Sequence, residues 1–107
     1  MEVSELVEAM KLLRGNKKAD DSHWKVAKPY FIRTVTHHYT GKLTKVTAKE
    51  IVLTDCAWIA DDGRFATALE KGEFNEVEPF PEGDVIVGRG AILDAHVIRF
   101  GLPREQK

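Results

Sequence analysis

The feature that most constrains the fold is a stretch of strand-forming residues between Trp24 and Ala60. It is rich in Val, Ile, Thr, Tyr, Phe and Trp, which fit a pleated and partly buried surface. Within Tyr30 to Val35, apolar side chains fall on both alternating sets of positions, so we expect both faces of this strand to be at least partly buried. Gly41 interrupts the next strand and indicates a bend or bulge. The pattern predicts an antiparallel meander of three strands.

The remaining sequence completes a single domain of 107 residues. Apolar residues at helical spacing predict an amphipathic helix at the N-terminus. After the meander, Arg64 to Lys71 is expected to form a short helix that stops at Gly72. We expect the polar C-terminal tail to fray. The predicted order is a helix over residues 1–15, three strands over 24–60, a helical and acidic insertion over 61–83, two strands over 84–100 and the tail 101–107.

Two motifs add a family resemblance to this order of elements. The first is Gly41-Lys42-Leu43 with Val46, Ile51 and Leu53 after it, and the second is Gly88-Arg89-Gly90-Ala91-Ile92. Together they resemble the Sm-like family, which includes the LSm proteins and bacterial Hfq, over roughly residues 29–98. The resemblance implies a mainly β fold with an N-terminal α-helix: a small, strongly bent, five-stranded antiparallel barrel with a short helical insertion. An SH3-like or OB-type barrel is the alternative.

The resemblance also carries expectations about assembly and ligand. Sm-like barrels pair their edge strands head to tail and close into rings, and the family binds RNA. Thr47 stands where the family usually has Asp, and Glu50 stands near its usual Asn, so only Arg89 and Gly90 are carried over as binding residues. Longer stretches of the chain are similar to uncharacterised phage and prophage proteins, a likeness that implies no activity.

Charge is distributed unevenly along a chain whose net charge is −1. Lys11 to Lys49 holds ten basic and two acidic residues, whereas Glu50 to Lys107 holds twelve acidic and six basic ones. The near-neutral total excludes a protein that coats nucleic acid by charge alone. A solvated surface is the preferred interpretation of the basic half, and a local basic face is the alternative.

No arrangement of residues predicts catalysis, a metal site or a cofactor. His37 and His38 are adjacent in a strand, so their side chains point to opposite faces. Cys56 follows Asp55, whose charge disfavours a thiolate. The run Asp61-Asp62-Gly63 is typical of a turn and a helix cap. We therefore expect a protein that is not an enzyme.

Binding is better supported, with Arg89 as the main candidate. Gly88 and Gly90 flank it, so its guanidinium can grip phosphate bidentately or stack on a base. The aromatic residues available for stacking are Trp58, Tyr30 and Tyr39, with burial in the core the preferred interpretation of Trp58. The predicted ligand-binding residues are Arg89, Gly90, Gly88, Lys49, His37 and His38.

Two functions follow as hypotheses. The first is a non-catalytic, ring-forming Sm-like homo-oligomer that binds RNA or a small nucleotide, and a phage-encoded form would act on host signalling or RNA. The alternative is a structural or protein-interaction module of a phage or prophage, which would dock a host protein through Glu70 to Asp84 and the first helix. The single cysteine, the short apolar runs and the lack of a leader predict no membrane and a cytoplasmic location, in the host cytoplasm if phage-encoded.

Overall fold

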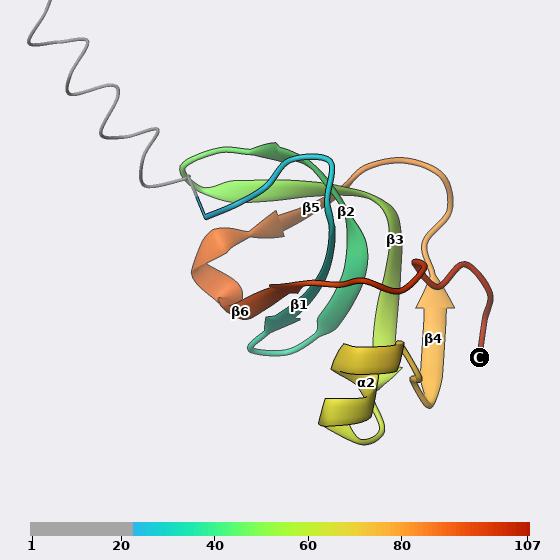
Figure 1. Ribbon diagram of the computed structural model, residues 1–107. Helices are drawn as coiled ribbons and strands as arrows, with labels where there is room; N and C mark the ends of the chain where they lie inside the picture. Colours follow the sequence, from blue (N-terminus) through green and yellow to red (C-terminus); the bar gives the residue numbers. More distant parts are fainter. Residues whose placement is uncertain (1–22) are drawn as a thin grey trace, which may run out of the picture.

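β-strands dominate the computed structural model, which describes residues 23–107 (Figure 1). The helix predicted over residues 1–15 lies outside the described residues. The elements follow in the order β1 (Pro29–Thr34), β2 (His38–Val46), β3 (Glu50–Asp61), α2 (Phe65–Lys71), β4 (Glu76–Pro79), β5 (Val85–Gly88), the 3-10 helix η1 (Arg89–Ala91) and β6 (Ile92–Val97).

The strands form one antiparallel sheet of six strands, in the order β4-β3-β2-β1-β6 with β5 also paired to β3. The long β3 carries two partners on the edge that faces away from β2: β5 pairs with residues 50–53 and β4 with residues 57–61. The mainly β prediction is confirmed. The sheet is not closed into the five-stranded barrel that we expected, and β4 adds a strand within the predicted insertion.

The sheet bends at Gly41, as the sequence predicts. Thr40 pairs with Ala57 and Lys42 with Thr54, so two residues of β3 oppose one glycine. This is a bulge, and one of the two residues, Asp55, has a left-handed backbone with φ of 52°. A Cβ atom on Gly41 would lie 3.1 Å from the Cβ of Leu53. Glycine therefore permits the close approach of β2 to β3.

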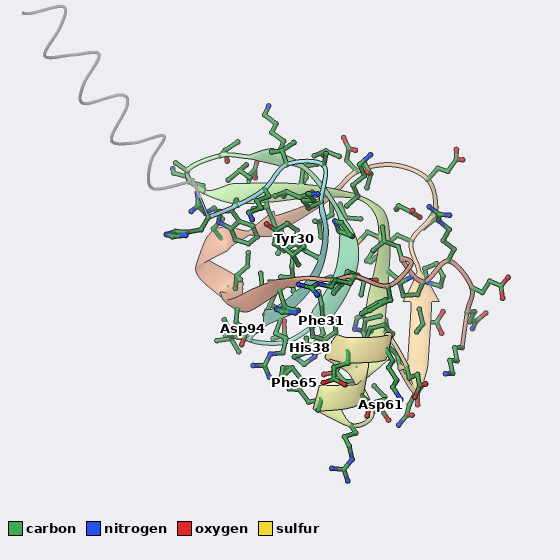
Figure 2. The ribbon with its side chains drawn as sticks, in the orientation of Figure 1. Tyr30, Phe31, His38, Asp61, Phe65 and Asp94 are labelled. Atoms are coloured by element: carbon green, nitrogen blue, oxygen red, sulfur yellow. The ribbon has the colours of Figure 1, made fainter. Side chains whose placement is uncertain are left out.

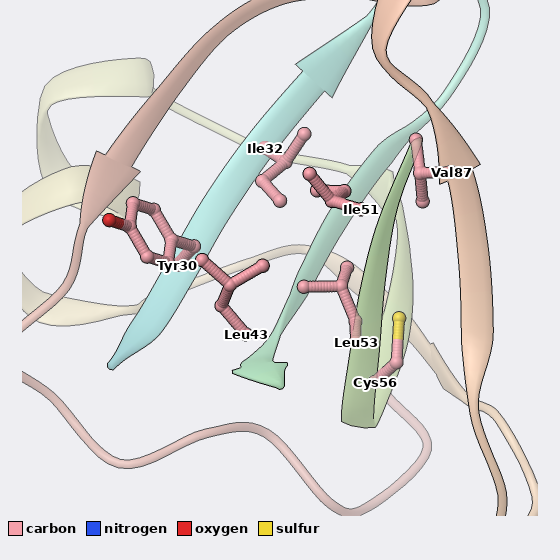
Figure 3. Packing of buried hydrophobic residues seen from close by; sticks show 7 residues of the cluster. All are labelled: Tyr30, Ile32, Leu43, Ile51, Leu53, Cys56 and Val87. Carbon is pink, nitrogen blue, oxygen red and sulfur yellow. The ribbon is translucent and has the colours of Figure 1, made fainter. Parts of the chain in front are cut away.

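Apolar side chains form two clusters, one on each side of the sheet. The first cluster contains Tyr30, Ile32, Leu43, Ile51, Leu53, Cys56 and Val87 (Figure 3). The second contains Phe31, Ala57, Ile59, Ala68, Phe74, Val77 and Ile98. Consecutive residues of β1 enter opposite clusters, and Tyr30, Phe31 and Ile32 are 3%, 1% and 0% exposed. Burial of both faces of this strand, predicted from its pattern, is confirmed.

The second cluster is covered by α2 and the C-terminal tail. Phe31 stacks on Phe74, with ring centroids 5.6 Å apart, and Phe74 meets Phe100 edge-on at 5.9 Å. The tail is ordered, in contrast to the predicted fraying: Val77 and Lys107 exchange two backbone hydrogen bonds of 3.0 Å. These bonds cover the outer edge of β4, which lies beside the C-terminus in Figure 1.

Gly72 ends α2, as predicted, and supplies a test of this packing. Its φ is +69°, and a Cβ atom there would lie 2.3 Å from the ring of Phe100. We expect Gly72→Ala to lower the free energy of unfolding by about 1–3 kcal/mol, because it combines backbone strain with overpacking. Urea unfolding monitored by circular dichroism measures this change.

Gly88→Ala is the matched control. Gly88 has φ of −67°, and no atom lies within 4 Å of the position of its Cβ. Its effect should stay within about 0.5 kcal/mol. Equal losses at the two positions would contradict the packing of Phe100 against Gly72.

Candidate functional site

Four of the predicted ligand-binding residues meet at the turn between β2 and β3. The backbone N–H of Arg89 donates to the carbonyl oxygen of Lys49 at 2.9 Å, and Gly88 pairs with Glu50. The side chain of Arg89 also reaches this turn, where its Nη1 donates to the carbonyl oxygen of Thr47 at 2.6 Å. Arg89, Gly88, Gly90 and Lys49 therefore share one corner of the molecule, formed by η1 and the turn.

The geometry of Arg89 differs from the expectation. Its side chain is half-buried and stabilises the turn through the carbonyl of Thr47, rather than standing clear of the backbone. The positive φ values among the described glycines belong to Gly63, Gly72 and Gly83. Gly90 therefore does not have a left-handed backbone that would require glycine at this position.

His37 and His38 lie at the other end of β2, and their side chains point to opposite faces, as predicted. The ring of His37 lies 5.6 Å from that of Trp58 and 6.2 Å from that of Tyr39. His38 Nδ1 lies 2.7 Å from an Asp62 carboxylate oxygen, and its ring meets Phe31 edge-on. The six predicted residues are thus divided among three places, and they do not form one site.

The His38–Asp62 pair connects β2 to the loop before α2. The predicted helix-capping role of the Asp61-Asp62-Gly63 run is wrong, because Arg64 is the N-cap of α2 and no side chain bonds there. The predicted turn is present, since Asp61 accepts a hydrogen bond of 2.9 Å from the backbone of Gly63. The pair serves to position the loop against the sheet.

An ion pair and a cation–π contact, both made by Arg33, join β1 to β6 and to α2. Arg33 donates its Nε to Asp94 at 2.8 Å, and its guanidinium lies 4.3 Å from the centre of the Phe65 ring. The hydrogen bond from Arg33 lowers the pKa of Asp94 from its ordinary value, so this carboxylate stays ionised at neutral pH. Figure 2 shows Asp94, Phe65 and His38 on the side of the molecule that carries α2.

Within residues 23–107, no group of three or more His, Cys, Asp or Glu side chains is placed to hold a metal ion. Cys56 is buried in the first cluster. Burial, with a smaller contribution from the charge of Asp55, raises the pKa of its thiol to about 12. This thiol is therefore not an activated nucleophile. None of the helices in the described part of the chain is long and apolar enough to cross a membrane.

The described part of the chain also forms a groove that the sequence did not predict. It has a volume of about 950 Å³ and lies where the start of β1, the end of β6 and α2 meet. A backbone hydrogen bond of 3.0 Å from Ile98 to Pro29 fixes the end of β6 against the start of β1. We call this hollow the basic groove, because its lining includes five basic or imidazole side chains, His23, Lys25, Lys28, His96 and Arg99, and one carboxylate, Glu70.

The chemistry of the basic groove suits an anion. Lys25, Lys28 and Arg99 are exposed, and no ion pair joins any of them to a residue in the described range. The signal for this site in the sequence was only the excess of basic residues before Lys49. Nothing in the local spacing indicated that Arg99, more than seventy positions after Lys25, would line the same hollow.

Of the predicted stacking residues, Tyr30 lies apart from Trp58 and Tyr39, which are paired across β2 and β3. Tyr30 is buried, and its hydroxyl accepts a hydrogen bond of 2.8 Å from the backbone of Lys25. Trp58 is 38% exposed, so the preferred prediction of burial in the core is wrong. Trp58 belongs to a set of neighbouring rings that we call the aromatic row. In order of contact, these rings are Trp58, His37, Tyr39 and Phe80.

A scan against protein-family models and searches of the curated proteins and the solved structures found no match to this chain.

The buried thiol gives a direct test of the first cluster. At about pH 8 a free cysteine is partly ionised, whereas the raised pKa keeps Cys56 protonated in the native protein. We expect a thiol reagent to label Cys56 far more slowly in buffer than in denaturant. Labelling at equal rates in the two conditions would contradict the burial of Cys56. The thiol would then be accessible enough to act as a nucleophile.

Proposed function

We propose that the chain is a non-catalytic binding protein whose ligand is RNA or a small nucleotide, held by its phosphates in the basic groove. The observation that carries this proposal is the lining of the groove, where five basic or imidazole side chains face one carboxylate. Such local concentration of positive charge attracts an anion even on a molecule whose net charge is −1.

The residue types in the basic groove match the chemistry of phosphate. Arg99 offers a planar fork that binds two phosphate oxygens together, and Lys25 and Lys28 act as compact point charges. The volume of about 950 Å³ lies within the range of roughly 300–1,000 Å³ that is usual for small-molecule sites. The site can therefore accept a nucleotide or a few residues of a single strand.

Assembly into a ring is the second part of the proposal. In the described range, β5 pairs only with β3 and β6 only with β1, so each leaves one edge of unpaired backbone. These edges carry the exposed side chains Ile86 (63%) and Leu93 (65%). We propose that β5 of one copy pairs with β6 of the next, in the head-to-tail manner of an Sm-like ring. A phage-encoded role on host signalling or RNA belongs to the same proposal.

In such a ring, the groove would be repeated once per copy. Lys49 is exposed at the turn that Arg89 stabilises, and it would supply a further cation at each junction. Several weak phosphate contacts along one strand would then add together. The alternative is a protein-interaction module without a nucleotide ligand, and the binding test below separates the two.

The groove is tested by removing two of its cations. In fluorescence anisotropy with a labelled single-stranded RNA and a labelled cyclic nucleotide, the double variant Lys28→Ala/Arg99→Ala should weaken binding about tenfold or more. The affinity of the wild-type protein should fall as salt rises, because binding releases counterions.

The matched control removes the same charges elsewhere. Lys45 and Arg64 are exposed and do not line the groove, so Lys45→Ala/Arg64→Ala should bind nearly as well as wild type. A loss confined to Lys49→Ala would move the site to the β2–β3 turn. No binding by the wild-type protein to either probe would overturn the proposal in favour of the protein-interaction module.

The ring is tested by native mass spectrometry. The wild-type protein should be a homo-oligomer, and Ile86→Lys or Leu93→Lys should shift it to smaller species by placing a charge on a paired edge. Val26→Lys changes another exposed apolar side chain that lies outside both edges, and it should leave the mass unchanged. A monomeric wild-type protein at micromolar concentration would contradict this part of the proposal.

A further inference from the structure

The aromatic row remains outside the proposed nucleotide site. Its rings follow one another with centroid distances of 5.6 Å from His37 to Trp58 and 6.2 Å from His37 to Tyr39. Phe80 continues the row 6.2 Å from Tyr39. Trp58 and Phe80 are 38% and 41% exposed, although aromatic side chains of this size are costly to leave in water. None of the four residues lines the basic groove.

Two backbone contacts hold the row in place. Tyr39 and Trp58 are paired across β2 and β3, so their side chains lie on the same face of the sheet. The backbone N–H of Phe80 donates to the carbonyl oxygen of Cys56 at 2.9 Å, which fixes Phe80 beside β3. Tyr39 and Trp58 are on strands, His37 directly precedes β2 and Phe80 directly follows β4, so the backbone that carries the row is organised before any ligand binds.

The residues around the row are acidic. Glu78 lies directly opposite Trp58 in the pairing of β3 with β4. Beyond Phe80, a hollow of about 340 Å³ is lined by three carboxylates, Asp55, Glu82 and Asp84. Asp55 is paired with Arg104 of the tail, whereas no ion pair joins Glu82 or Asp84 to a residue in the described range. The unneutralised charge therefore lies at the Phe80 end of the row.

We propose that the aromatic row and its acidic border bind an extended cationic peptide, rich in arginine or lysine, from a protein partner. A guanidinium or ammonium group is attracted to the face of an aromatic ring and also to a nearby carboxylate. The aliphatic stems of these side chains would cover the exposed parts of Trp58 and Phe80. The phosphates of a nucleic acid would instead be repelled by Glu78, Glu82 and Asp84, so a peptide fits this surface better than RNA does.

This inference is independent of the proposed nucleotide site. The basic groove and the aromatic row share no residue, and their borders have opposite charge. A protein with both surfaces could hold an anionic and a cationic partner together. The two sites can therefore be tested separately in the same protein.

The experiment uses the full chain and a short arginine-rich peptide that carries fluorescein, in an anisotropy titration. The comparison peptide replaces each arginine with citrulline, which keeps the shape and removes the charge. Binding of the arginine peptide should exceed that of the citrulline peptide by about tenfold or more and should weaken with salt. Phe80→Ala, Trp58→Ala and Glu82→Gln/Asp84→Asn should each reduce binding about fivefold or more.

Phe65→Ala is the matched control, because Phe65 is exposed to the same extent as Trp58 but lies outside the row. It should bind the arginine peptide nearly as wild type does. Lys28→Ala/Arg99→Ala should also retain peptide binding, which separates a failure of this inference from a failure of the nucleotide site. Thermal unfolding of each variant identifies any loss of fold, and the Glu82→Gln/Asp84→Asn variant changes only exposed side chains.

Three results would overturn the inference. The first is equal or absent binding of the two peptides by the wild-type protein. The second is binding of RNA, but not of the peptide, that depends on Trp58 and Phe80, since the row would then be a platform for bases. The third is a lower oligomeric mass for Trp58→Ala or Phe80→Ala, since a second copy of the chain would then cover the row.

Discussion

The structure depends on the burial of β1 on both faces. Tyr30 and Ile32 enter one apolar cluster while Phe31, between them, enters the other. A strand with this pattern cannot lie at the surface, so both sides of the sheet must be covered. The bend at Gly41 folds the sheet around the first cluster, and α2 with the C-terminal tail covers the second. This one requirement explains why so short a chain has two cores.

The same arrangement of strands determines where the two candidate binding surfaces, the basic groove and the aromatic row, are formed. The basic groove forms at the start of β1, where the end of β6 and α2 approach it from regions far apart in the sequence. The aromatic row forms near the other end of β1, where β2 begins beside the last part of β3. The strands between them are packed on both faces, which fixes the backbone that carries each surface. Rigid placement of this kind lowers the entropic cost of binding.

Much of the fold could be predicted because its signals are local. Alternation in β1, Gly41 at the bend and Gly72 at the end of α2 each act through neighbouring residues. The strand β4 was missed because only Val77 of its four residues is buried, and the order of the tail depends on distant partners such as Asp55 and Val77. The six predicted ligand-binding residues do not form one site for a related reason. The two histidines lie at the start of β2 and Lys49 lies in the turn after its end, so the strand separates them. The basic groove could not be predicted because it brings Lys28 and Arg99 together from distant parts of the sequence, and no local spacing indicates that arrangement.

The central claim is that an anionic ligand occupies the basic groove, and amide chemical shifts test it most directly. A titration of the isotopically labelled full chain with single-stranded RNA, followed by two-dimensional NMR, reports every backbone site that the ligand affects. The account predicts saturable shifts concentrated in residues 23–28 and 95–99. Shifts concentrated in residues 47–50 and 88–90, or in the aromatic row, would place the ligand elsewhere, and the absence of any shift would contradict nucleotide binding altogether.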